Sequence, residues 1–100
     1  MIKYKLQLTD TAFNDLDDIM DYIALDAPVR AETYVDKLLD KIRILKNMPK
    51  RCALAPESGR RGYKLRHLIH GKYRILFIVR KKEVFVLHVI HGARLLDPDC

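Results

Sequence analysis

The sequence has no tryptophan, two cysteines, four glycines and four prolines among its 100 residues. No apolar run approaches the roughly 20 residues that a membrane-spanning helix needs. The first five residues, Met1 to Lys5, do not form the hydrophobic block of a signal peptide. Without an export signal, Cys52 and Cys100 are predicted to be free thiols in a reducing cytoplasm. These absences argue against a membrane protein and against a secreted domain held together by disulfides.

The residues that are present favour one folded domain spanning residues 1–100, because 49% are hydrophobic and 32% are charged. The net charge of +6 is unevenly distributed. Residues 1–48 carry seven Lys/Arg against nine Asp/Glu, and residues 49–100 carry twelve against four. The second half, with a net charge of +8, predicts a basic surface suited to phosphates or to an acidic partner. The alternative is a solvated basic face that serves solubility alone.

The first half of the chain predicts a short strand and two helices. Residues 4–8 alternate apolar and polar side chains, and residues 9–11 then supply helix-capping groups. Apolar residues next recur at steps of three and four in two stripes, Phe13, Leu16, Ile19, Met20 and Ile23, followed by Ala31, Tyr34, Val35, Leu38, Ile42 and Leu45. The acidic residues of the first helix, Asp15 included, are predicted to take the side away from the stripe.

Breaks in the pattern set the predicted bounds of these helices. Residues 26–28 end the first helix and begin the second, since Pro28 is tolerated in a first turn. The second helix is expected to end near Met48, before Pro49. A break this short predicts an antiparallel helical hairpin. Its apolar stripe is interpreted as core, although a groove between the helices would also receive a partner helix.

The second half predicts a loop and three strands. Residues 49–62 hold two prolines, two glycines and four basic residues without periodicity, and a loop of this length indicates function or mobility. Alternation then predicts strands at residues 64–69, 73–80 and 84–90, joined by tight turns into an antiparallel meander. Both faces of the last two strands are apolar, so the sheet is either covered on both sides or keeps one face for a partner. The expected class is α+β, a helical hairpin on a small antiparallel sheet.

Motifs for phosphate-loop, dinucleotide, zinc or nucleophile-elbow chemistry are missing, and no cofactor or metal is predicted. The four histidines have loose spacings that put members of a pair on opposite faces of a strand. The stronger candidate is a cationic patch on one sheet face made by Arg66, Arg74, His91 and Arg94. Arg66 and Arg74 lie at nearly equal distances from the predicted turn at residues 70–71, so they are expected to be cross-strand neighbours. The structural alternative is that Arg74 pairs with an acidic residue near the helices, while His91 and Arg94 cap a strand end.

Several segments together resemble one known family. They are a short N-terminal strand, the helix at residues 12–23, the end of the second helix at residues 42–49, the segment Gly62 to Leu68, the strand Gly71 to Phe77, and the terminal segment His88 to Arg94. In this order and spacing they resemble the RelE/ParE toxin superfamily of bacterial type II toxin–antitoxin pairs over essentially the whole chain. The Tyr-Arg-Ile strand at residues 73–75 and the His-Gly-Ala-Arg segment at residues 91–94 are the most specific parts.

The resemblance implies a helical hairpin on an antiparallel sheet and a neutralising antitoxin that wraps the toxin and carries operator binding. It also implies one of two activities. RelE-like members cut mRNA in the ribosomal A site with basic residues on the sheet, and ParE-like members poison DNA gyrase. On this resemblance, an antitoxin is expected to bind the helical stripe through six apolar side chains, Phe13, Leu16, Met20, Leu38, Ile42 and Leu45.

Three departures from the nuclease branch favour a ParE-like protein. Leu68 and Ile69 stand where that branch places a further arginine, and nothing aromatic follows Phe85. The nearest carboxylates, Glu57 and Glu83, lie in a loop and a turn and not on the strands. If the chain were a nuclease, Arg66, Arg74 and Arg94 would contact the scissile phosphate, with His91 as the acid, or Lys50 or Lys64 would serve a lysine-based mechanism. A non-toxic relative that keeps only antitoxin binding is the third hypothesis.

Overall fold

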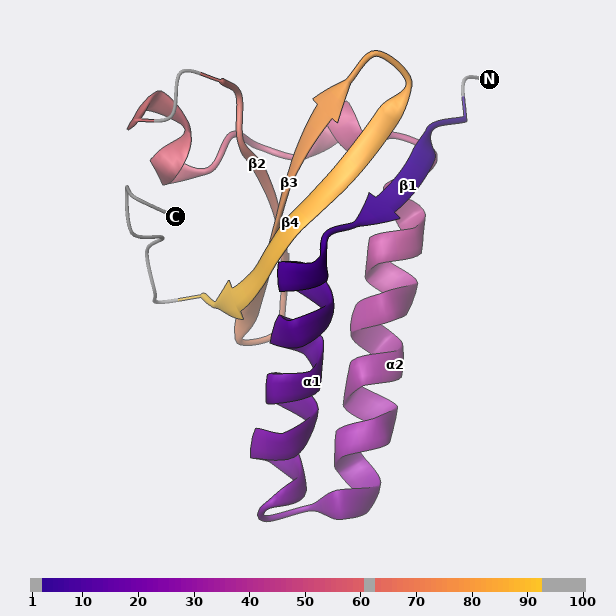
Figure 1. The fold of residues 1–100 in the computed structure, drawn as a ribbon, viewed down its shortest axis with the longest axis vertical. Coiled ribbons are helices and arrows are strands. Elements are labelled where there is room, and N and C mark those ends of the chain that lie inside the picture. The colour runs from indigo at the N-terminus through magenta and orange to yellow at the C-terminus, as the bar shows by residue number, and fades with distance from the viewer. Residues whose placement is uncertain (1–2, 61–62, 93–100) are drawn as a thin grey trace.

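Two helices pack against one face of a four-stranded sheet in the computed structural model, which describes residues 3–60 and 63–92 (Figure 1). Along the chain the elements are β1 (Lys5–Leu8), α1 (Asp10–Ala24), α2 (Pro28–Ile44), the 3-10 helices η1 (Pro49–Arg51) and η2 (Pro56–Arg60), β2 (Arg66–His70), β3 (Tyr73–Arg80) and β4 (Glu83–His91). The α+β class and the helical hairpin predicted from the two periodicities are therefore confirmed.

The sheet has the strand order β1-β4-β3-β2. Strands β2, β3 and β4 form the predicted antiparallel meander, with two-residue turns at residues 71–72 and 81–82. Strand β1 joins the other edge in parallel to β4, with Leu6 opposite Val84. A parallel pair requires a long connection, and here both helices and the other two strands lie between the paired segments.

Local sequence signals explain where the helices begin, and a tertiary contact accompanies the end of α2. The Thr9 hydroxyl caps α1 by accepting the N–H of Ala12 at 3.1 Å, and Pro28 opens α2. Helix α2 ends at Ile44 and not near Met48, so the proline rule placed its end too late. The Lys46 carbonyl, just beyond the helix, accepts the N–H of Tyr4 at 2.8 Å and joins this turn to the chain entering β1.

Neither helix in the described part of the chain is long and apolar enough to cross a membrane.

The main core lies between the helices and the sheet. Its buried members are Ala12, Leu16, Ile19, Val35, Leu38, Ile42, Leu45, Ile75, Phe77, Val84, Val86 and Val89. Val86 and Val89 both belong to it because the pairing of β4 with β3 shifts by one residue opposite Leu76 and Phe77, as at a β-bulge. Asp15 was expected on the solvent side of α1, but its carboxylate accepts the N–H of Val89 at 3.0 Å and fixes α1 to β4.

The opposite side of the sheet, called the outer face below, is partly covered by the loop before β2. Ala55 and Leu65 form a second buried cluster there with Leu76 of β3 and Ile90 of β4. Residues 53–55 run beside residues 65–67, and the N–H of Ala55 donates to the Leu65 carbonyl at 2.7 Å. Of the segment predicted as a loop, residues 49–60 therefore contain η1 and η2 and partly cover the sheet.

Candidate functional site

The predicted basic patch does not assemble, because two of its arginines lie on opposite faces of the sheet. Arg66 pairs with Phe77 and Arg74 pairs with Ile69, so the expected pairing of Arg66 with Arg74 is wrong by three residues. Phe77 belongs to the core beneath the helices, which places Arg66 on the helix side. On β3, Ile75 and Phe77 face the helices. Arg74 is adjacent to Ile75 and therefore points to the other side of the sheet, the outer face.

Arg66 uses its guanidinium to hold the start of the covering loop. Its Nη1 donates to the Cys52 carbonyl at 2.7 Å and to the Lys50 carbonyl at 3.3 Å. Burial raises the pKa of the neighbouring Cys52 thiol, and the positive charge of Arg66 acts in the opposite direction. Cys52 is a free thiol, as predicted. Cys100 lies outside the described residues.

Arg74 forms a buried ion pair with Glu57, which η2 brings over the outer face. Its Nη2 donates to Glu57 Oε2 at 2.6 Å and its Nη1 to Oε1 at 3.1 Å. Only 4% of the Arg74 side chain and 2% of the Glu57 side chain are exposed. Two parallel bonds between a guanidinium and a carboxylate match in geometry and in charge. Arg74 is therefore neutralised and enclosed by an acidic residue, as in the structural alternative, but this residue comes from the covering loop and not from near the helices.

His67 completes this group from β2. Its Nδ1 lies 3.1 Å from Nη1 of Arg74. Partial burial and the adjacent Arg74 guanidinium lower the pKa of His67, while the Glu57 carboxylate opposes them. Carboxylate, guanidinium and imidazole are the groups that acid–base cleavage of a phosphodiester uses, but here the carboxylate and guanidinium are engaged with each other. Within residues 3–60 and 63–92 no group of three His, Cys, Asp or Glu side chains is placed to bind a metal.

His91 lies at the end of β4, away from this group. It pairs with Tyr73, which faces the helices, and the two ring centroids are 5.9 Å apart. Tyr73 also contacts Tyr34 of α2 at 5.8 Å, and burial together with the neighbouring tyrosines raises the pKa of its hydroxyl. Arg94, the fourth member of the predicted patch, lies outside the described residues. Lys50 and Lys64 are exposed beside the loop.

The apolar helical stripe is largely core and not a free surface. Leu16, Leu38, Ile42 and Leu45 are buried against the sheet. Met20 is partly buried against the same cluster. Phe13 alone of the six expected antitoxin contacts is well exposed, at 53%. The core interpretation of the stripe therefore holds for most of its members, because the helices use them to cover the sheet.

The sequence pattern places Glu57 in a loop and predicts no role for it. One signal was available, since Glu57 is the only acidic residue between Asp40 and Glu83. A single carboxylate in a long basic segment is a natural partner for an arginine that alternation places on an apolar strand. Which arginine it meets depends on how the covering loop folds back over β3.

Comparisons with known proteins agree with this architecture. The chain matches the family of ParE toxins of type II toxin–antitoxin systems, parDE, over residues 6–96. The chromosomal ParDE system of P. aeruginosa superposes with a TM-score of 0.72 at 22% identity, covering 89% of this chain and 96% of that chain. The RelBE2 toxin–antitoxin complex of Mycobacterium tuberculosis gives 0.66 at 23% identity, covering 94% and 97%.

At these identities the two solved structures are evidence for the fold alone. No curated protein sequence matches the chain. The family match, in contrast, extends from the second residue of β1 to beyond β4. The resemblance inferred from the order of the sequence segments is thus confirmed, and the chain belongs to the ParE toxin family of type II toxin–antitoxin systems.

Proposed function

We propose that this chain is a toxin that acts by binding and not by catalysis, that its target is DNA gyrase, and that a co-encoded antitoxin neutralises it. The proposal rests on the bonds that Arg66 of β2 and Arg74 of β3 make within the chain. Arg74 is enclosed in an ion pair with Glu57, and Arg66 donates to two main-chain carbonyls. A nuclease of this fold would need such cations free to stabilise a phosphate transition state.

The physical argument concerns the Arg74–Glu57 pair. To reach a phosphate, the Arg74 guanidinium would have to leave a carboxylate at 2.6 Å, and the buried Glu57 would then lose its guanidinium partner. A buried carboxylate is costly without a paired cation. The pair therefore supports a structural role, holding η2 on the sheet, and it supports the ParE-like activity over RNA cleavage.

Several observations support an antitoxin partner. The two similar solved structures are described as toxin–antitoxin systems or complexes, and residues 49–100 carry a net charge of +8, which suits an acidic partner. The exposed Phe13 ring on α1 is the member of the predicted interface best placed for contact. We propose that operator DNA is bound only through the antitoxin, and that the toxin acts in the cytoplasm, where gyrase is found.

Induction of the chain alone in a bacterial host tests this proposal. We expect growth arrest with induction of the DNA damage response and with intact translated transcripts. Restoration of growth by the neighbouring short reading frame would identify the antitoxin. Phe77→Asp, which places a carboxylate in the core, is the control for an unfolded chain. Codon-phased cuts in translated mRNA without DNA damage would overturn the gyrase proposal.

The second candidate is a RelE-like, ribosome-dependent endoribonuclease. One observation favours it, namely that Glu57, Arg74 and His67 gather on the outer face within hydrogen-bonding distance. This activity would require η2 to move away from β3, because the carboxylate and guanidinium now bind each other. His67→Gln should then abolish cleavage while the chain stays folded. Normal growth after induction of a stably folded chain would instead indicate the non-toxic relative.

A further inference from the structure

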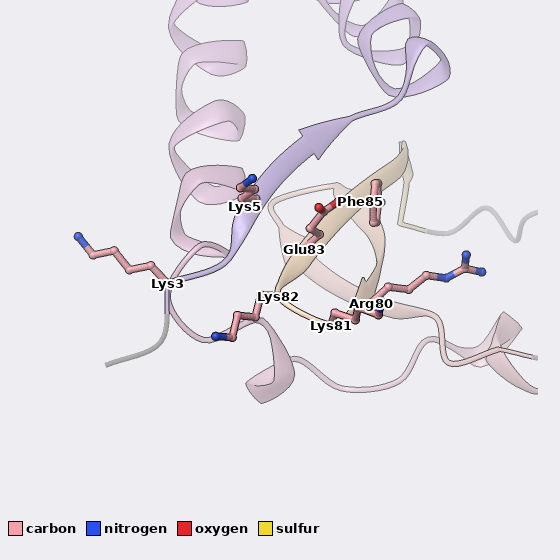
Figure 2. A pocket seen from close by; sticks show the side chains of 7 residues that line it. All are labelled: Lys3, Lys5, Arg80, Lys81, Lys82, Glu83 and Phe85. Atoms are coloured by element: carbon pink, nitrogen blue, oxygen red, sulfur yellow. The ribbon is translucent and has the colours of Figure 1, made fainter.

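A basic pocket lies where the β3–β4 turn meets the edge strand β1, on the outer face of the sheet (Figure 2). We name it the turn pocket. Its volume is about 710 Å³, within the range of roughly 300–1,000 Å³ that ligand pockets occupy. Its lining residues are Lys3, Lys5, Arg80, Lys81, Lys82, Glu83 and Phe85. None of them belongs to the predicted basic patch.

The charge of the turn pocket is strongly unbalanced, with five cations and one carboxylate. Among the described residues, none of the five cations forms an ion pair. The carboxylate of Glu83 accepts a hydrogen bond from the Gln7 amide at 3.4 Å. Positive charges gathered on one concave surface raise the local concentration of anions, so the pocket is suited to a ligand that carries several negative charges.

The backbone conformation of Lys81 independently indicates that the positive charge at this turn serves a function. Lys81 has a φ of 54°, in the left-handed region that side chains other than Gly, Asn and Asp rarely adopt. The other hairpin turn provides an internal comparison, because Gly71 occupies the same first turn position with a φ of 57°. At the β3–β4 turn the chain carries a lysine where glycine or asparagine would be less strained.

Phe85 gives the turn pocket an aromatic surface. It pairs with Ile78 of β3 and with Gln7 of β1, and it is partly buried in the sheet. Figure 2 shows Glu83 and Phe85 along β4, with Lys5 on one side and Arg80 on the other. Cations beside an aromatic face are the combination that binds unpaired nucleotides, since phosphates meet the charges and a base stacks on the ring.

We propose that the turn pocket binds a single-stranded nucleic-acid segment, with its phosphates on the cations and one base against Phe85. The kinds of cation favour phosphate over an acidic peptide. Four of the five are lysines, whose compact ammonium groups bind phosphates as point charges, whereas carboxylates are matched best by the planar fork of arginine. This binding requires neither gyrase nor an antitoxin, so it stands or falls independently of the proposed function.

Fluorescence anisotropy with the purified chain tests the proposal. The probe is a labelled oligothymidine of about 12 nucleotides, within the usual range of single-strand sites. Lys81→Asn combined with Lys82→Gln should weaken binding several-fold. It should also flatten the dependence of log affinity on log salt by roughly 0.7 for each phosphate that the variant no longer neutralises. Because asparagine tolerates the left-handed turn, the melting temperature of this variant should not fall.

Matched controls separate the turn pocket from general charge effects. Lys37→Gln combined with Lys46→Gln removes the same charge from exposed positions in and just after α2 and should leave affinity nearly unchanged. Phe85→Leu should weaken binding of oligothymidine but not of an abasic strand of equal length. The proposal is overturned if both double variants bind alike, or if duplex DNA, the abasic strand or a polyglutamate peptide of equal charge binds as tightly as oligothymidine.

Discussion

The two ends of β3 on the outer face carry the same kind of side chain in opposite states. At the first end, Arg74 is buried and bonded to Glu57, and the preceding turn begins with Gly71. At the other end, roughly 20 Å away at the usual rise of a strand, Arg80 and its two neighbouring lysines are exposed and the turn begins with Lys81. At the first end the charge of Arg74 is compensated and glycine occupies the left-handed turn position. At the other end the side chains of Arg80 and the lysines are exposed and the backbone of Lys81 is strained.

The difference shows that a basic residue indicates a binding surface only when no carboxylate of the same chain reaches it. The single acidic residue between Asp40 and Glu83 meets Arg74, and within residues 3–60 and 63–92 no ion pair compensates the far end of β3. We therefore expect the Arg74 end to respond to substitution mainly through stability, and the Lys81 end mainly through binding.

The largest expected effect breaks the buried end of this comparison. Glu57→Gln removes the charge of the carboxylate and leaves the Arg74 guanidinium buried without it, which should lower the free energy of unfolding by about 3–5 kcal/mol. Urea unfolding followed by circular dichroism measures this loss. The double variant Glu57→Leu with Arg74→Met removes both charges and should recover most of the stability. Equal losses in the single and double variants would contradict a buried, coupled pair.

A smaller loss is expected at the turn that precedes Arg74. Gly71→Ala forces a side chain into the left-handed region, which costs roughly 1–2 kcal/mol. The added Cβ would also lie 2.6 Å from the Tyr34 hydroxyl oxygen. Combining it with Tyr34→Phe should relieve the steric part alone, because the ring carbon behind that oxygen is 3.7 Å away. Thermal unfolding of both variants checks this expectation, and a harmless Gly71→Ala would refute it.

The reverse change is expected at the exposed end. Lys81→Asn relieves backbone strain and should stabilise the fold by about 0.5–1 kcal/mol. For a chain of this size the melting temperature should then rise by a few degrees, roughly 2–8 °C. Lys82→Asn is the matched control, since Lys81 is the one residue other than glycine with a positive φ in the described part of the chain. An equal rise in both variants would attribute the gain to reduced repulsion and not to the backbone.

The smallest effect concerns the pH dependence that His67 adds to the buried end. Its pKa is lower in the folded protein than its ordinary value of 6.5, so the unfolded chain takes up the proton first. Stability should decline as the pH falls below about 6.5 and toward the folded pKa. His67→Gln should reduce the difference between melting temperatures at about pH 7.5 and about pH 5.5. His70→Gln controls for the loss of an imidazole from β2, and an undiminished difference would exclude His67 as its source.

Much of the fold was predictable because its signals are local. Thr9 caps α1 through a contact three residues away, and Pro28 fixes the start of α2. The period of two along β3 predicted the bounds that the structure has. The end of α2 was predicted four residues late, at Met48. A proline shows only the last residue at which a helix could end, because the residue before it is disfavoured in the helical conformation.

The candidate site was less predictable because its contacts are not local. Arg66 and Arg74 were expected side by side, but the pairing of β2 with β3 puts them on opposite faces. A strand shifted by one residue turns every side chain to the other face, and the turn sequence did not fix that register. Glu57 and Arg74 are seventeen residues apart, and their contact depends on the covering loop.

The sequence by itself determined the helical hairpin, the meander, the charged second half and the likeness to the ParE family, since these follow from periodicity, turn chemistry, composition and the order of segments. Only the tertiary structure decided which basic side chains remain available to bind a ligand. Lys3 and Lys5 approach the β3–β4 turn because β1 pairs with β4 across more than seventy residues of chain. Arg74 is neutralised because a loop folds back onto the sheet. Charge is a property of the sequence, but its compensation depends on which residues the fold brings together.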